Sequence, residues 1–327
     1  MTAIAILDDY QNVARELADW SALAKSCTIE TFRNNLAVPD DAARALAEFD
    51  IVCTMRERMA FPRALIERLP KLRLITITGP QMRSLDIAAA TERGVVVSHS
   101  TNRGPGGAAT PELAWGLILA VARSIPLEDR RMRSEGGWQT TLGMGLRGKT
   151  LGLVGLGRVG RVVAEIGRGF GVNLIAWSQN MTVHQAAECG AKLVDKDTLF
   201  RESDIVSLHV VLSDRTRNLV GAREIALMKK TAILINTARG PIVEESALLA
   251  ALRAGRIAGA GIDVFDVEPL PADHPIRRLE NVVLTPHLGY VADDVMRVWY
   301  EDTVKAITAF LDGKPIRLLN PEVMGRD

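Results

Sequence analysis

A glycine-rich turn between an apolar run and an amphipathic segment constrains the fold of this 327-residue chain most strongly. Residues 154–160 read Val-Gly-Leu-Gly-Arg-Val-Gly. In such a turn Gly155 permits a sharp bend, Gly157 permits a pyrophosphate to approach the backbone, and Gly160 permits close helix–strand packing. The preceding run predicts a strand, and residues 158–170 place apolar side chains on one helical face. The free N–H groups and dipole of that helix favour an anion, so the pattern predicts a dinucleotide site.

Short apolar runs alternate with helical segments along the whole chain. The strands expected from this pattern are residues 3–7, 28–32, 51–54, 72–77, 95–98, 150–154, 173–177, 204–208, 232–236, 258–263 and 282–285. The main expected helices are residues 11–17, 40–48, 62–69, 87–93, 111–125, 158–170 and 293–311. Strands and helices that alternate in this way predict an α/β protein with parallel sheets covered by helices.

The turn-forming residues of segment 100–110 interrupt this alternation, and a chain of this length suggests two domains. Too few residues follow the last helix to form a domain, so we expect that helix to return to the first one. The predicted domains are a discontinuous substrate domain, residues 1–99 plus 291–327, and a dinucleotide-binding domain, residues 100–290.

Composition excludes several classes of function. The chain has 40 basic and 39 acidic residues and only 5% aromatic residues, which argues against a nucleic-acid partner. Its longest apolar stretch, residues 113–122, is too short to cross a bilayer, and the N-terminus does not resemble a signal peptide. Cys27, Cys53 and Cys189 match no zinc or disulfide spacing, so we expect buried thiols in the cytoplasm.

The choice between NAD and NADP stays open. An NAD site of this type expects an acidic residue about 20 positions beyond the glycines, for the ribose hydroxyl. The next expected strand is followed by Ser178, Gln179 and Asn180. No carboxylate is present to repel a 2′-phosphate and no basic residue to attract one, so we favour NAD only slightly.

Three ionisable residues follow the late strands, where ligands bind in open α/β sheets. They are Arg239, Glu268 and His287. A histidine can exchange the hydroxyl proton when hydride moves to or from a carbinol carbon. A carboxylate bonded to the imidazole would fix its tautomer and favour its charged form, and a guanidinium can bind a substrate carboxylate. Each residue alone could equally be a surface charge, but their joint placement predicts an active site.

At these residues the chain resembles the D-isomer-specific 2-hydroxyacid dehydrogenase family. The resemblance rests on residues 154–160, Asn-Thr-Ala-Arg-Gly at 236–240, Asp-Val-Phe-Asp-Val-Glu-Pro at 263–269 and Thr-Pro-His-Leu-Gly at 285–289. It implies that Arg239, Glu268 and His287 are catalytic. It also implies a Rossmann coenzyme domain inserted into a flavodoxin-like substrate domain, and a homodimer formed through the coenzyme domains with the Pro111 helix contributing.

The resemblance also implies a set of cofactor contacts. Val210 to Leu212 and Thr216 match a region beside adenosine, and Asp263 matches a residue that receives the nicotinamide carboxamide. The complete expected set is Gly155, Gly157, Arg158, Val159, Gly160, Ser178, Val210, Val211, Leu212, Thr216, Thr237, Ala238 and Asp263.

The expected substrate loop departs from the family pattern. Many members bind the substrate carboxylate through backbone N–H groups of a loop that matches residues 79–86, but here Pro80 lacks an N–H group. Arg83 could compensate or face solvent. Arg56 and Arg58 could bind an acidic or phosphorylated substrate, or lie in a solvated loop. The expected substrate contacts are Arg56, Gly79, Pro80, Arg239 and His287.

The resulting prediction is an NAD(P)-dependent oxidoreductase that moves a hydride between nicotinamide and a small D-2-hydroxy or 2-oxo acid. The alternative is an NAD(H)-sensing, corepressor-like binding protein, since such a relative keeps similar Arg, Glu and His residues. Another dehydrogenase of the same fold is a third possibility. A phosphite enzyme stays open, whereas Glu268 stands where formate enzymes usually carry Gln. No metal is expected.

Overall fold

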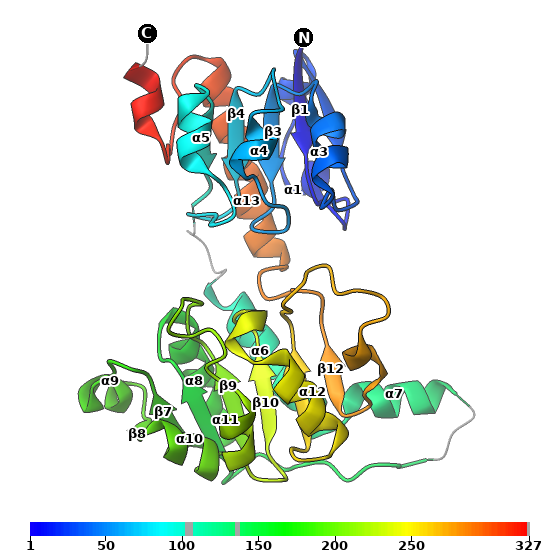
Figure 1. Ribbon diagram of the computed structural model, residues 1–327, viewed down its shortest axis with the longest axis vertical. Helices are drawn as coiled ribbons and strands as arrows, with labels where there is room; N and C mark the ends of the chain where they lie inside the picture. The colour runs from blue at the N-terminus through cyan, green and yellow to red at the C-terminus, as the bar shows by residue number, and fades with distance from the viewer. Residues whose placement is uncertain (102–106, 135–137, 326–327) are drawn as a thin grey trace. The chain divides into compact units, whose positions relative to one another are not determined.

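Two parallel β-sheets organise the protein into two compact units. The computed structural model describes residues 1–101, 107–134 and 138–325. The first unit comprises Met1–Gly106 and Ala292–Asp327, and the second comprises Gly107–Val291. The sheets have five and seven strands, and every strand pair is parallel (Figure 1). This confirms the predicted fold class of two parallel-sheet α/β domains. Residues 102–106 of the predicted boundary segment lie outside the described residues.

The first unit has the strand order β2-β1-β3-β4-β5, typical of flavodoxin-like sheets. Its strands are β1 (Thr2–Ile6), β2 (Cys27–Thr31), β3 (Ile51–Thr54), β4 (Leu74–Ile77) and β5 (Val96–His99). Its helices are α1 (Ala14–Leu17), α2 (Ser21–Ala24), α3 (Pro39–Leu46), α4 (Arg63–Ile66), α5 (Ile87–Glu92), α13 (Asp293–Leu311) and the 3₁₀ helix η4 (Pro321–Gly325).

Helices from both ends of the chain complete the first unit. Apolar side chains of α3, α4 and α5 pack with the sheet in one core. Helix α13 contacts β4, β5 and α1, so the expected return of the last helix to the first domain is what the structure shows (Figure 1). The C-terminal segment is fastened by Asn320, which is fully buried: its amide accepts from the Val97 N–H and donates to Val95 and Thr91.

The second unit has the order β12-β11-β10-β9-β6-β7-β8, with β6 at the point where the order reverses. Its strands are β6 (Thr150–Val154), β7 (Asn173–Trp177), β8 (Lys192–Leu193), β9 (Ile205–Leu208), β10 (Ile233–Asn236), β11 (Gly259–Ile262) and β12 (Val282–Leu284). Its helices are α6 (Ala109–Ala122), α7 (Ile125–Arg133), α8 (Arg158–Phe170), α9 (Val183–Glu188), α10 (Lys196–Glu202), α11 (Ala222–Leu227) and α12 (Glu245–Arg253), with 3₁₀ helices η2 (Gly240–Ile242) and η3 (Pro275–Arg278).

Alternate residues of the central strands face two separate cores in this unit. On β10, Ile233 and Ile235 pack with α6 and α8, whereas Leu234 packs with α10, α11 and α12. On β6, Leu153 belongs to the first core and Val154 to the second. Strands covered on both faces are apolar at nearly every position, which explains the continuous apolar runs in the sequence.

Two predicted helices have different bounds for identifiable reasons. The predicted helix 11–17 begins only at Ala14, because the Asp9 carboxylate accepts the N–H groups of Val13 and Ala14 at 3.0 Å each and Asn12 has a φ of 59°. The predicted helix 111–125 ends at Ala122, and α7 starts after Ser124, which has a left-handed φ of 51°. The short elements α2 and β8 were not predicted.

In the described part of the chain, no helix is both long and apolar enough to span a membrane. Within the same residues, no group of three or more His, Cys, Asp or Glu side chains is arranged to hold a metal ion. All three cysteines are buried and free.

Replacing Asn320 by Ala should lower the free energy of unfolding by about 3 kcal/mol, because it leaves the Val97 N–H and the Val95 carbonyl buried without partners. Urea unfolding followed by circular dichroism measures this change. The matched control is Asn34→Ala at an exposed position of the same unit, which should stay within about 0.5 kcal/mol of wild type. Equal stabilities of the two variants would contradict the expected contribution of Asn320.

Candidate active site

The glycine turn between β6 and α8 is built for close backbone contact. A Cβ on Gly160 would overlap the carbonyl oxygen of Gly155, and Gly155 itself has a φ of 96°. A Cβ on Gly157 would meet nothing within 4 Å, so space remains above this residue. Gly157 is also the N-cap of α8 and supplies no side-chain hydrogen bond. The turn therefore fits a pyrophosphate at the start of the helix.

A partly buried histidine, His209, which was not singled out from the sequence, supports this turn. The N–H of His209 donates to Val154 at 2.8 Å, and its carbonyl is 2.8 Å from where a Cβ on Gly155 would lie. Its Nε2 lies 2.9 Å from Ser207 Oγ, and burial lowers the pKa of His209 to about 4. The imidazole is thus neutral near pH 7 and fills space beneath the glycines without adding charge.

The other expected cofactor residues follow the same edge of the sheet. Val210 packs against Gly155, and the Thr216 hydroxyl accepts from the Ser213 N–H and donates to the Val211 carbonyl, both at 2.7 Å. Leu212 packs at the margin of the unit's core. These contacts give the segment after β9 a fixed shape.

The remaining residues of the turn and of β7 take different positions. Val159 is partly buried and packs against the core under α8, whereas Arg158 is exposed. Ser178 follows β7 directly and is half-buried. Its carbonyl accepts the Met181 N–H.

Arg239 lies on a turn that is shaped by Asn236 at the end of β10. The Asn236 side chain is 1% exposed; it accepts from the Ala238 N–H at 3.0 Å and donates to the Arg239 carbonyl at 2.9 Å. A buried amide that bridges the turn in this way holds the backbone of Arg239 in one conformation. Asn236 is the first residue of the Asn-Thr-Ala-Arg-Gly motif, but no role of its own was assigned to it from the sequence; its place at a strand end is the signal that could have suggested one.

Backbone contact brings the loop of Glu268 to the turn of Arg239. A Cβ on Gly240 would overlap the backbone of Phe265, so the two segments touch where no side chain intervenes. The charge of Arg239 in turn lowers the pKa of Glu268. Any residue larger than glycine at position 240 would separate these two segments.

The turn that carries His287 is held by the fully buried carboxylate of Asp263 at the end of β11. One oxygen accepts from the Thr285 hydroxyl at 2.6 Å and the Leu288 N–H at 2.7 Å, and the other accepts from the Gly289 N–H at 3.0 Å. The His287 N–H donates to the Asp263 carbonyl at 2.8 Å. Burial raises the pKa of Asp263 above its ordinary value, against the effect of these hydrogen bonds.

Glu268 and His287 form a direct pair: Glu268 Oε2 lies 2.6 Å from His287 Nδ1. The other oxygen, Oε1, accepts from the Phe265 N–H at 2.9 Å, which fixes the orientation of the carboxylate. Because Nδ1 is engaged by the carboxylate, Nε2 is the imidazole nitrogen left for proton exchange.

The electrostatics of this pair favour an ionised glutamate. Burial opposes ionisation of Glu268, but the hydrogen bond and charge of His287 and the Phe265 N–H outweigh it, so the pKa of Glu268 lies below its usual value of 4.5. A carboxylate with a depressed pKa stays charged throughout the neutral range and loses its charge only as the pH falls through the lowered value. The ionised carboxylate accepts the hydrogen bond from His287 Nδ1 and so fixes the orientation of the imidazole.

Thr237 has a buried hydroxyl with no hydrogen-bond partner among the described residues. Its residue is 7% exposed and stands between Asn236 and Ala238 on the same turn as Arg239. A buried hydroxyl of this kind is expected to bond to something, so it suits a polar group of a bound ligand. The Thr237 hydroxyl and the open space over Gly157 are two features of this unit that fit a bound nicotinamide dinucleotide.

The three remaining substrate candidates, Arg56, Gly79 and Pro80, belong to the first unit. Arg56 and Gly79 both have left-handed φ angles, 51° and 83°, and the guanidinium of Arg56 lies against Gly79 where a Cβ would otherwise be. The Arg56 N–H donates to Thr78 Oγ1 at 2.8 Å. These residues follow β3 and β4, at the carboxyl edge of their sheet.

Comparison with known proteins agrees with this geometry. The family described as D-isomer specific 2-hydroxyacid dehydrogenase, NAD binding domain, matches residues 115–289. The glyoxylate reductase of Thermococcus litoralis is 42% identical over 271 residues, which cover 80% of each chain, and that of Aeropyrum pernix is 41% identical with the same coverage. A crystal structure from Ralstonia solanacearum, described as a D-3-phosphoglycerate dehydrogenase oxidoreductase, has 33% identity and a TM-score of 0.91 over 99% of this chain and 98% of that one.

The matched family region contains all three residues predicted to be catalytic and all of the expected cofactor positions. The relatives at the highest identities reported above are reductases, and both share four-fifths of their length with this chain. The protein therefore belongs to the D-isomer-specific 2-hydroxyacid dehydrogenases, enzymes that transfer a hydride between a nicotinamide cofactor and a 2-hydroxy or 2-oxo acid.

Proposed function

We propose that the enzyme reduces a small 2-oxo acid of the glyoxylate type to the corresponding D-2-hydroxy acid, with His287 as general acid. The observation that carries this proposal is the 2.6 Å contact between Glu268 and His287 on a turn fixed by Asp263. A bound NADH or NADPH supplies the hydride for the carbonyl carbon. His287 donates its Nε2 proton to the carbonyl oxygen, and the charge of Glu268 stabilises the imidazolium before that transfer.

In this proposal the carboxylate of the substrate is bound by Arg239 and by residues of the first unit. Arg239 can bind a carboxylate through two parallel hydrogen bonds and can stabilise charge on the reacting oxygen. In the substrate domain, residues 1–99 plus 291–327, we assign Arg56 and the backbone at Gly79 and Pro80 to the substrate. Because Pro80 has no N–H group and the Gly79 N–H donates to Ser100, recognition at this loop depends on the Arg56 guanidinium.

The dinucleotide-binding domain, residues 100–290, holds the cofactor in this proposal. The pyrophosphate of the cofactor binds at Gly155, Gly157, Arg158, Val159 and Gly160. The adenosine binds at Ser178, Val210, Val211, Leu212 and Thr216, and the nicotinamide binds at Thr237, Ala238 and Asp263. The absence of a carboxylate at positions 178–180 leaves NADP allowed, with NAD slightly preferred. An NAD(H)-sensing binding protein is not favoured, because the similar proteins are named as reductases.

We also propose a cytoplasmic homodimer. Three free cysteines suit a reducing compartment. On and after α7, large apolar side chains are exposed: Ile125 at 52%, Met132 at 57%, Trp138 at 74% and Leu142 at 100%. Apolar groups gathered along one segment suit an interface between copies of the chain, to which α6, with Pro111 in its first turn, would contribute.

A panel of 2-oxo acids tests the reaction. Glyoxylate, hydroxypyruvate and phosphohydroxypyruvate should oxidise NADH, and NADPH with a lower kcat/KM, as measured by absorbance. Replacing His287 by Ala should lower kcat by roughly 10²–10⁴ without changing cofactor affinity. The control is His184→Ala, which removes an exposed histidine paired with Glu188 at 3.4 Å. Failure of every acid with both cofactors, or full activity of the His287 variant, would exclude the proposal.

Replacing Glu268 by Gln removes the charge beside the imidazole and keeps the size of the side chain. The neutral amide cannot stabilise the imidazolium that donates the proton as an ionised carboxylate does, so kcat should fall by roughly tenfold or more. Nicotinamide absorbance measures the rate, with Glu280→Gln, an exposed residue of the same unit, as the control. Equal kcat values for wild type and Glu268→Gln would rule out an electrostatic role.

The homodimer is tested by changing Leu142, which is fully exposed in the single chain, to Asp. A charge in an apolar interface is costly to desolvate, so the variant should shift from dimer to monomer at micromolar concentration. Analytical ultracentrifugation measures the mass, and Leu311→Asp on the first unit serves as a control that leaves the mass unchanged. A monomeric wild type would refute the proposed assembly.

A further inference from the structure

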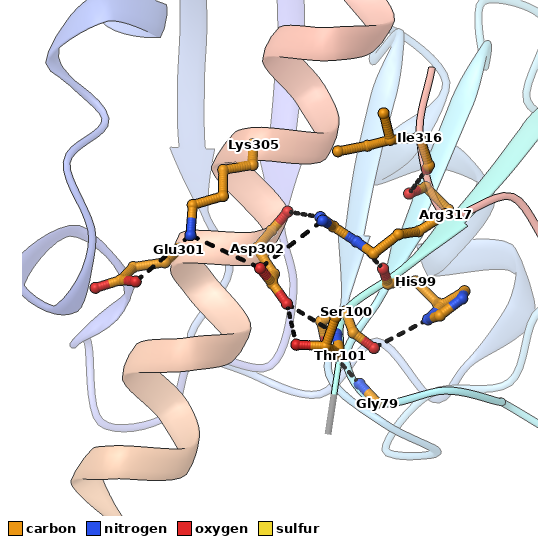
Figure 2. A network of polar contacts seen from close by, with 10 residues as sticks. Gly79, His99, Ser100, Thr101, Glu301, Asp302, Lys305, Ile316 and Arg317 are labelled. Atoms are coloured by element: carbon orange, nitrogen blue, oxygen red, sulfur yellow. Dashed lines mark hydrogen bonds and ion pairs between the residues drawn. The ribbon is translucent and has the colours of Figure 1, made fainter. Parts of the chain in front are cut away.

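A polar network in the first unit joins the segment after β5 to the middle of α13 (Figure 2). The two connections between the units begin on these elements: the chain leaves the first unit shortly after Thr101, and it re-enters just before α13. The network also reaches the loop that begins at Gly79. None of its residues has a role in the chemistry proposed above except Gly79.

Asp302 is the acidic centre of this network. The residue is 7% exposed in the middle of α13, and its Oδ2 accepts from both donors of Thr101, the N–H at 2.8 Å and the hydroxyl at 2.7 Å. Burial alone would raise the pKa of Asp302, but the Thr101 hydrogen bonds and the charges of Arg317 and Lys305 bring it below its ordinary value. A carboxylate bound by two donors of one residue fixes both the position and the rotation of that residue.

Arg317 fastens the other side of the same segment. Its Nε donates to the His99 carbonyl at 2.8 Å and its second terminal nitrogen donates to the Asp302 carbonyl at 2.6 Å. The backbone of Arg317 also accepts the His99 N–H at 3.0 Å. Figure 2 shows the guanidinium between the helix and the strand end. The segment after β5 is therefore held at position 99 by Arg317 and at position 101 by Asp302.

Ser100, the residue between these two anchors, holds the substrate loop. Its side chain accepts the Gly79 N–H at 2.6 Å (Figure 2). The N–H of Ser100 donates to the Ile77 carbonyl at 2.9 Å. Ser100 is 2% exposed, so water does not compete for the Gly79 bond. Because the neighbours on both sides are fixed, the backbone of Ser100 cannot move without breaking bonds to Arg317 or Asp302, and this holds the Ser100 hydroxyl within reach of the Gly79 N–H.

We propose that Asp302 is a positioning residue that sets the place of Gly79, and with it the substrate loop, through Thr101 and Ser100. It touches no substrate or cofactor group and acts only through this chain of hydrogen bonds. The consequence for turnover rests on the proposed function, because it takes the loop at Gly79 and Pro80 to bind the 2-oxo acid. The coupling between Asp302 and Gly79 does not rest on it.

Amide hydrogen exchange of Gly79, followed by NMR, tests the coupling directly. In Asp302→Asn the exchange rate of Gly79 should rise by about tenfold, because a neutral amide oxygen is a weaker acceptor than a carboxylate oxygen for the two Thr101 donors, and Ser100 gains freedom. Ser100→Ala removes the acceptor of Gly79 itself and should give at least the same rise with less disturbance of the fold. Glu301→Gln, the same kind of substitution on an adjacent exposed residue of α13, should leave Gly79 unchanged. Thr101→Ser keeps both donors and should also match wild type.

Kinetics with the 2-oxo acid tests the consequence. In Asp302→Asn and Ser100→Ala the KM for the acid should rise by about tenfold with a smaller change in kcat, while the dissociation constant of the cofactor stays at the wild-type value. A merely structural role would lower cofactor binding and thermal stability together, without this separation.

The outcomes separate the two proposals. The positioning role is overturned if the Asp302→Asn variant folds and its Gly79 exchanges at the wild-type rate. It is also overturned if Gly79 exchanges faster in both Asp302→Asn and Ser100→Ala while the KM for the acid stays unchanged. If the wild-type enzyme reduces no 2-oxo acid, the proposed function fails, whereas the exchange of Gly79 still decides whether Asp302 positions the loop. If Asp302→Asn does not fold, Ser100→Ala decides both measurements.

Discussion

The buried carboxylate of Asp263 is the interaction on which the geometry of the catalytic unit depends. A charge without solvent is costly unless donors surround it, and here three donors from residues 285, 288 and 289 converge on its two oxygens. Because β11 and β12 are parallel neighbours, the end of one strand lies beside the end of the other, and Asp263 can close the turn that follows β12. His287 is held on that turn with a φ of 54°, a conformation that few residues other than glycine adopt without such support.

Much of the fold could be predicted from the sequence, because strands covered on both faces leave continuous apolar runs and the glycine turn has one common structural context. The helix Arg158–Phe170 has the predicted bounds. The errors lie where a side chain competes with the helix for backbone donors, as Asp9 does at α1, or where a single left-handed residue divides a long apolar segment, as Ser124 does between α6 and α7. Periodicity reports which residues are buried, and it does not report such local hydrogen bonds or backbone angles.

The candidate site could be predicted only as a set of residue types at strand ends. Sequence placed Glu268 and His287 after neighbouring strands, and the rule for parallel sheets made their proximity a reasonable expectation. It could not provide the contact between Gly240 and Phe265, which depends on two backbones meeting without side chains. The role of Asn236 was missed although it lies in a quoted motif, and His209 was missed because it belongs to no motif; the role of each is recognised only from the groups that it supports. The substrate and cofactor contacts stay predictions.

In the proposed function, the two units divide the determinants of reaction and of specificity along the chain. The proposed catalytic residues Arg239, Glu268 and His287 and the glycine turn all lie within Gly107–Val291, so the proposed chemistry can be kept while the other unit changes. Relatives named for glyoxylate, phosphoglycerate and lactate share this architecture, which is what a common catalytic unit with a variable substrate loop predicts. In this chain two residues of the loop have no backbone N–H group available: Pro80 lacks the group, and the Gly79 N–H donates to Ser100. A loop with fewer backbone donors depends more on side-chain charge and on fixed geometry. In the proposed substrate loop, the Arg56 guanidinium that lies against Gly79 would supply that charge, and the bonds that extend from Ser100 and Thr101 to a buried acid on α13 would supply that fixed geometry.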